Sequence, residues 1–169
     1  MDRGNRKSRG DRLIRFTEGT LRMLGYLLIL LMGILVLDVV WQVLARYLMK
    51  SPSSFTDELA RFLLIWVGLF GSAYALGKKR HLAIDLFVNR LKGKKRVVAG
   101  DVIRLMILLF IVPVLVVGGT RLVWITLTLK QVSASLAIPL GVVYLALPIS
   151  GLLMVVFVLA DWAESRKTG

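Results

Sequence analysis

The chain has 169 residues, 57% of them hydrophobic, with a mean hydropathy of +0.75 and a formal net charge of +13. This composition argues against an ordinary soluble domain, which rarely exceeds about half apolar residues. The sequence contains no cysteine, which excludes disulfide bonds, thiolate metal sites and thiol nucleophiles.

The excess of hydrophobic residues lies in four apolar runs, at about residues 23–44, 59–76, 103–127 and 138–159. Each run approaches the roughly 20 residues that a helix needs to cross a bilayer. Helices of a soluble bundle would show polar residues at helical spacing, and the long apolar stretches of the first and third runs show none. The first run is also too long for the apolar region of a signal peptide. We therefore expect an all-α membrane protein with four transmembrane helices in one domain, residues 23–162.

The number of lysine and arginine residues outside the spans alternates between high and low along the chain. Seven precede the first span, two lie in the first connection, eight in the second, one in the third and two in the tail. Short basic segments stay in the cytoplasm. We therefore expect the N-terminal segment 1–22, the connection 77–100 and the tail 163–169 to be cytoplasmic. Topology and anionic lipid account for the positive charge, so no nucleic-acid partner is expected.

Polar residues in the first span recur every four positions, at Asp38, Gln42 and Arg46, and so share one helix face. A carboxylate at this depth costs several kcal/mol if it faces lipid unpaired, so the stripe is expected to face protein. It forms either a structural ion pair, within the chain or at a subunit interface, or an ion relay. The structural interpretation is favoured because the inner halves of the spans offer no titratable groups for a relay.

A turn at residues 51–54, which contains Pro52, leads into the second span. Glu58 lies in the first helical turn and can contact Arg61, three residues later, or Arg46 across the corner. Removal of Glu58 is therefore predicted to leave an arginine unpaired.

Small residues at Gly68, Ser72 and Ala75 lie near one face of the second span and permit close helix packing. Two interpretations stay open, since this face can pack against the chain's own helices or dock another protein.

The second connection contains apolar residues at helical spacing, Ile84, Phe87, Val88 and Leu91. This pattern predicts a short amphipathic helix on the inner membrane surface, in contact with lipid. His81 is the only histidine, and a single histidine among cations is not expected to bind metal.

Arg121 lies near the outer end of the third span, at a depth similar to that of Asp38, and the two form a candidate ion pair. Pro139 is expected to open the fourth span near its first helical position. Pro148 is expected to kink that span.

Motifs of catalysis are missing from the sequence, which has no P-loop, HExxH, GxSxG or clustered carboxylates. No catalytic residue, cofactor or metal site is expected, and the chain is not expected to be an enzyme. It also lacks the repeated halves with matching broken helices that are typical of a complete transporter. The sequence therefore predicts a small subunit of a larger membrane assembly.

Short segments along the chain match one known family, and the residues that carry the match are Arg46, Tyr47, 54–61, Trp66, Gly77, 81–85, 133–135, Pro139, Tyr144, Pro148 and Gly151. With these residues the chain, from about position 21 to 162, resembles the small membrane subunit of tripartite ATP-independent periplasmic (TRAP) transporters, the DctQ-like family. Phe55 departs from the pattern, because many members have tryptophan there.

The resemblance implies a scaffold subunit of a sodium-coupled transporter that imports organic acids such as dicarboxylates or sialic acid. Its implied partners are a large multi-span transport subunit, which it stabilises in the membrane, and a periplasmic substrate-binding protein, which it helps to dock. The residues themselves also allow an alternative function, a self-sufficient homo-oligomeric four-span transporter or channel. The polar stripe Asp38–Gln42–Arg46 is the feature that suggests it.

Overall fold

The computed structural model describes residues 3–48, 54–78 and 94–168, and these residues are almost entirely helical. The elements are α1 (Arg3–Leu48), α2 (Ser54–Lys78), α4 (Lys94–Phe110), the π-helix η1 (Ile111–Gly118), α5 (Gly119–Thr128), α6 (Leu140–Tyr144) and α7 (Ala146–Thr168). An isolated β-bridge joins Val132 and Pro139. The predicted all-α class is confirmed.

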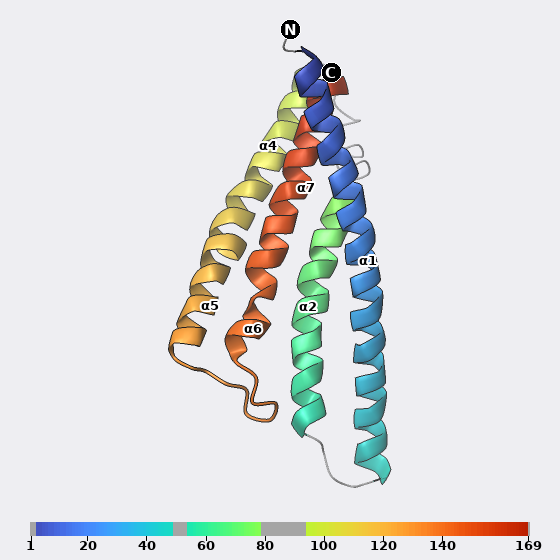
Figure 1. Ribbon diagram of the computed structural model, residues 1–169, viewed down its shortest axis with the longest axis vertical. Coiled ribbons are helices and arrows are strands. Elements are labelled where there is room, and N and C mark those ends of the chain that lie inside the picture. Colours follow the sequence, from blue (N-terminus) through green and yellow to red (C-terminus); the bar gives the residue numbers. More distant parts are fainter. Residues whose placement is uncertain (1–2, 49–53, 79–93, 169) are drawn as a thin grey trace.

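Four helical segments are long and apolar enough to cross a membrane, namely Phe16–Leu48, Ser54–Lys78, Val98–Thr128 and Leu140–Ala163. They coincide with the four predicted spans. The start of α1 and the end of α7 lie at one end of the molecule (Figure 1). The end of α1, the start of α2 and the α5–α6 connection lie at the other end, which we call the loop end. That the loop end faces outward stays a prediction, because it concerns the orientation of the chain in the membrane. The amphipathic helix predicted at 84–91 lies outside the described residues.

Helix α1 begins at Arg3 and continues without a break into the first span. The described part of the basic segment, residues 3–22, is thus an extension of the first transmembrane helix. Its glycines weaken a helix by only about 1 kcal/mol each, which does not interrupt it. Thr17 and Leu24 are already buried, so the packed part of α1 begins before the apolar run that starts at Met23.

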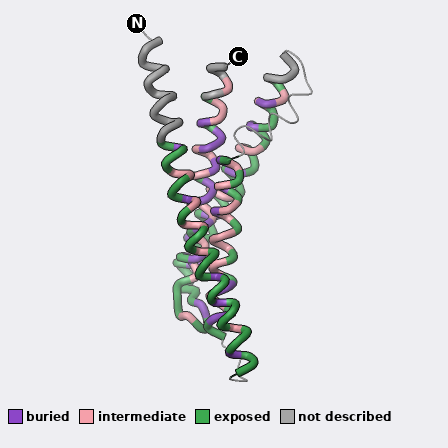
Figure 2. The backbone as a smooth tube through the Cα atoms, turned by 90° about the vertical axis from the view of Figure 1, so that its right-hand side faces the viewer, coloured by how far each residue is buried: buried purple, intermediate pink, exposed green. Residues whose placement is uncertain are grey.

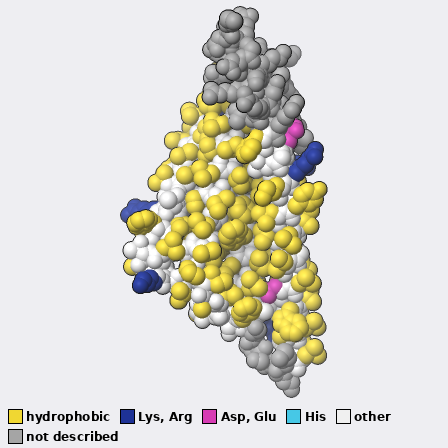
Figure 3. Space-filling model, viewed as in Figure 1, with side chains coloured by type: hydrophobic (Ala, Val, Ile, Leu, Met, Phe, Trp, Pro, Cys, Tyr) yellow, Lys and Arg dark blue, Asp and Glu magenta, His cyan; other side chains and the backbone are white. Residues whose placement is uncertain are grey.

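Helix α7 is the centre of the fold, because it contacts all the other helical elements. Helix α1 packs on α2 and α7 only, whereas α4, η1 and α5 pack on the other side of α7. Buried residues therefore follow the contacts between the helices, while the outward turns are exposed (Figure 2). The face of the molecule shown in Figure 3 is mainly hydrophobic, and large hydrophobic residues are exposed along all four spans, as expected for a chain whose surroundings are lipid or another membrane protein.

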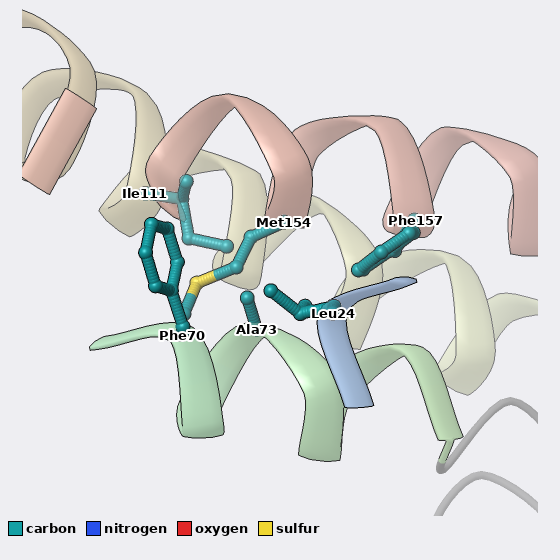
Figure 4. Packing of buried hydrophobic residues seen from close by; sticks show 6 residues of the cluster. All are labelled: Leu24, Phe70, Ala73, Ile111, Met154 and Phe157. Carbon is teal, nitrogen blue, oxygen red and sulfur yellow. The ribbon is translucent and has the colours of Figure 1, made fainter. Parts of the chain in front are cut away.

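The hydrophobic core draws one or two residues from each of four elements (Figure 4). Its buried members are Leu24 of α1, Phe70 and Ala73 of α2, Ile111 of η1, and Met154 and Phe157 of α7. Trp66 lies against Phe70 with the rings edge to face, 5.3 Å between centroids. The core therefore joins the α1–α2 hairpin to the second half of the chain.

The two prolines within the third and fourth spans change the helix in different ways. A proline lacks an N–H group and its ring clashes with the carbonyl four residues earlier. At Pro113 the helix widens into the π-turns of η1 and continues. Near Pro148 the helix is interrupted at Leu145, between α6 and α7, next to the residue four positions before the proline, while the predicted kink stays a prediction. Pro139 precedes α6 as its N-cap residue, one position earlier than predicted.

Candidate functional site

A hydrogen-bonded link joins α1 to the start of α2 within the membrane-spanning region. The Gln42 side-chain amide donates to Asp38 Oδ2 at 2.8 Å and to the Thr56 backbone carbonyl at 2.9 Å. Asp38 is only 8% exposed. Asp38 and Gln42 thus lie on a face turned toward protein, but Arg46, the third residue of the predicted stripe, is exposed, so the stripe as a whole does not face the chain's own helices. The partner of the Asp38 carboxylate is an amide on its own helix.

The loop between α5 and α6 is held in place by Glu58 of α2. Its carboxylate accepts hydrogen bonds from the backbone N–H groups of Ser135 and Leu136, at 2.8 and 3.2 Å, and the buried Ser133 hydroxyl accepts a further bond from the Leu136 N–H group at 3.1 Å. Successive N–H groups that converge on one anion form a compact anion-binding turn.

The same loop is ordered by its own backbone. Ser133 N–H donates to the Ile138 carbonyl and Leu140 N–H donates to the Gln131 carbonyl, both at 2.9 Å. Lys130 and Ala137 have φ angles of 49° and 53°, which turn the chain at each end of the loop. The α5–α6 loop therefore has a fixed conformation and is held against α2 by Glu58.

Three of the predicted ionic contacts are absent from the described residues. Glu58 bonds to the loop backbone, so its predicted pairing with Arg61 or Arg46 is wrong, and its removal would strand backbone N–H groups instead of an arginine. Arg61 pairs with Asp57 at 2.7 Å on the exposed side of α2. Arg46 and Arg121 are both exposed, and Arg121 does not reach Asp38. The predicted cluster is thus divided, because its members lie on different helix faces.

A second polar contact, which the sequence reasoning missed, lies near the termini. Arg104 of α4 donates from Nε to Asp161 of α7 at 2.8 Å and from Nη1 to Asp101 at 3.3 Å. The Arg104 side chain is 7% exposed and that of Asp161 is 15% exposed. The expectation that the inner halves of the spans carry no titratable groups is therefore wrong. This pair could have been predicted from the sequence, because Arg104 and Asp161 lie at matching depth in two antiparallel spans.

The small-residue face of α2 is open. Gly68, Ser72 and Ala75 are exposed, and a Cβ atom added to Gly68 would meet nothing within 4 Å. The Ser72 hydroxyl donates to the Gly68 carbonyl at 2.7 Å, so it places no unsatisfied donor on the face. The chain's described helices do not use this face, and its docking role stays a prediction.

Three polar side chains hold the elements of the chain in fixed relative positions. Gln42 fixes α1 against α2, Glu58 fixes the α5–α6 loop against α2, and Arg104 fixes α4 against α7. None of the described His, Asp and Glu residues gather into a group of three that could hold a metal ion. The arrangement is suited to holding surfaces in fixed relative positions.

Comparison with known proteins places these features in context. A family model described as the DctQ component of tripartite ATP-independent periplasmic transporters matches residues 35–168. A Haemophilus influenzae protein described as a TRAP transporter small permease protein is 29% identical over 144 residues, which are 84% of each chain. SiaQ of Vibrio cholerae, a sialic acid TRAP transporter small permease protein, is 32% identical over 88 residues, 52% of this chain and 51% of that protein.

A third relative is much longer than this chain. The isethionate TRAP transporter permease protein DctMQ of Oleidesulfovibrio alaskensis is 26% identical over 132 residues, which are 77% of this chain but 21% of that protein. In that permease, a segment similar to this chain is continuous with a far larger polypeptide.

Proposed function

This chain belongs to the DctQ component family of tripartite ATP-independent periplasmic transporters, and from that membership we propose that it is the scaffold subunit of a sodium-coupled importer of organic acids. The observation that carries the proposal is the family match over residues 35–168, a segment that includes the C-terminal part of the first span and the whole of the other three. The chain is a multi-pass protein of the bacterial inner membrane.

The proposed main partner is a large permease that contains the transport pathway. Its support is the DctMQ relative, in which the matching segment is 21% of one long permease chain. The described polar side chains of this chain support a structural role, since Gln42, Glu58 and Arg104 join helices and loops to one another. We assign no substrate-binding residue to this chain.

The proposed energy source and substrate follow from the chemistry of the family and of its members. A transporter that is independent of ATP needs an ion gradient to accumulate its substrate, and we propose sodium. Sialic acid and isethionate, named for two relatives, are organic anions, one a carboxylate and the other a sulfonate. We propose an organic acid of this kind as the substrate.

The proposed second partner is a periplasmic substrate-binding protein, docked partly on the loop end. The support is the ordered loop at 129–139, which Glu58 fastens to α2 and which leaves Gln131, Val132 and Ala134 exposed. A fixed loop can bind a partner without first losing conformational entropy.

Affinity purification of the tagged chain from its native membrane in mild detergent tests the scaffold role. We expect a much larger multi-span protein in stoichiometric amount. Recovery of the chain alone, as a defined homo-oligomer even after lipid-preserving extraction, would contradict the proposal and favour the self-sufficient transporter. The purified complex in vesicles, supplied with candidate binding proteins, then tests sodium coupling, because uptake should stop when the sodium gradient is collapsed.

A further inference from the structure

The exposed face of α5 carries an arginine for which the described chain provides no carboxylate. Arg121 lies seven residues before Thr128, where its span ends, which is about 10 Å along a helix. Its helical neighbours on the same face are Val117, Trp124 and Ile125, all exposed. Lys and Arg side chains project from the apolar surface at the α5 edge of the molecule (Figure 3).

The opposite side of α5 is the one that packs within the chain. Val123 and Thr126 are buried, and a Cβ atom on Gly119 would lie 2.8 Å from Leu147 Cβ of α7. Helix α5 contacts only η1, α6 and α7. The Arg121 face is therefore directed away from the rest of the chain.

Several other charged side chains within the described spans have partners in the chain. Asp38 bonds to Gln42, Arg61 to Asp57, and Arg104 to Asp161. Arg22 and Arg46 are also exposed without a carboxylate partner among the described residues, but both lie outside the apolar run 23–44. Arg121 lies within the run 103–127, where its guanidinium presents five N–H donors on an apolar face. The Thr120 and Thr128 hydroxyls nearby donate to carbonyls of their own helix and offer Arg121 no charge.

We propose that the α5 face centred on Arg121 and Trp124 is a contact surface for the large permease, and that a carboxylate of that permease pairs with Arg121. This inference rests on the proposed scaffold function. Charge complementarity identifies the partner group, since an arginine in an apolar interface requires an anion. Trp124, 73% exposed, lies one turn away, and tryptophan and arginine are the residue types that contribute most to protein interfaces.

The first test compares two charge reversals in the complex purified through a tag on this chain. Arg121→Glu should lower the amount of large permease recovered per chain by at least about tenfold, because one buried partner of a charge pair is reversed. Arg121→Lys should retain most of it. Lys130→Glu is the matched control, since it makes the same charge change in the loop beyond the span and should leave recovery unchanged. Full recovery with Arg121→Glu would overturn the inference.

The second test leaves Arg121 in place, so it remains decisive if Arg121→Glu fails to fold. A photo-crosslinking phenylalanine derivative replaces Trp124 in the intact complex, and the matched control replaces Tyr47, an equally exposed aromatic residue at the loop end of α1. We expect a crosslink to the large permease from position 124 well above that from position 47. A yield no higher than the control, in a complex that has formed, refutes the α5 surface and leaves the scaffold function intact. Failure of the unmodified chain to bring down any large permease refutes both.

Discussion

Separation of Arg104 from Asp161 should destabilise the protein strongly. The two side chains are 7% and 15% exposed, and their N–O distance is 2.8 Å. Removal of one partner of a buried pair costs about 3–5 kcal/mol, because the other charge stays buried. The more exposed Asp101 also binds Arg104, and water reaches part of Asp161, so we take the lower end of that range for Arg104→Ala. A loss of about 3 kcal/mol corresponds to roughly a 100-fold change in the folding equilibrium.

The assay is a double-mutant cycle on the purified chain, unfolded by titration with a denaturing detergent. The variants are Arg104→Ala, Asp161→Ala and the pair together. The coupling free energy should reach at least about 2 kcal/mol, because the double variant leaves no buried charge without its partner. An Arg104→Leu, Asp161→Leu variant should recover much of the stability, since an apolar replacement of a buried pair is often neutral.

The chain supplies a matched control in its exposed pair. Asp57 and Arg61 are 2.7 Å apart, but their side chains are 59% and 73% exposed. An exposed pair contributes about 0–1 kcal/mol, so the same cycle on these residues should give a small coupling. If the Arg104–Asp161 coupling is no larger than the Asp57–Arg61 coupling, then burial does not govern the strength of these pairs and the reasoning is refuted.

The remaining predictions concern the loop, a glycine contact and the α1–α2 link. Glu58→Gln should raise the rate of tryptic cleavage after Lys130 several-fold, because the loop N–H groups lose their anion, and an unchanged rate would show that the loop is ordered without the carboxylate. Gly151→Val should lower the stability by about 1–3 kcal/mol in the same detergent titration, since a Cβ atom at position 151 would lie 2.8 Å from Leu115 Cβ. Gly68→Val is the control, and it should lower the stability less because a Cβ atom at position 68 would meet nothing within 4 Å. Gln42→Leu should lower the stability by about 1–3 kcal/mol, because Asp38 stays buried without a donor, and a stability equal to that of the unmodified chain would contradict the role of this link.

The membrane class and the four spans could be predicted from the sequence because they depend on local composition. A run of about 20 apolar residues is a span wherever its neighbours lie. The shared face of Asp38 and Gln42 was predictable for the same reason, since four-residue spacing is a property of one helix. The sequence predicted a kink at Pro148 from the missing N–H group, whereas the break between α6 and α7 at Leu145 came from the structure.

Partners that are distant in the sequence were decided by the tertiary structure alone. Glu58 and Ser135 are 77 positions apart, and Arg104 and Asp161 are 57 apart. From spacing, Glu58 had an arginine three residues away, but the fold brings backbone N–H groups to its carboxylate instead. Arg121 and Asp38 are at similar depth, yet α1 and α5 are not in contact. Depth along a helix can be counted from the sequence, whereas the direction in which each side chain points depends on how the helices rotate and pack around α7.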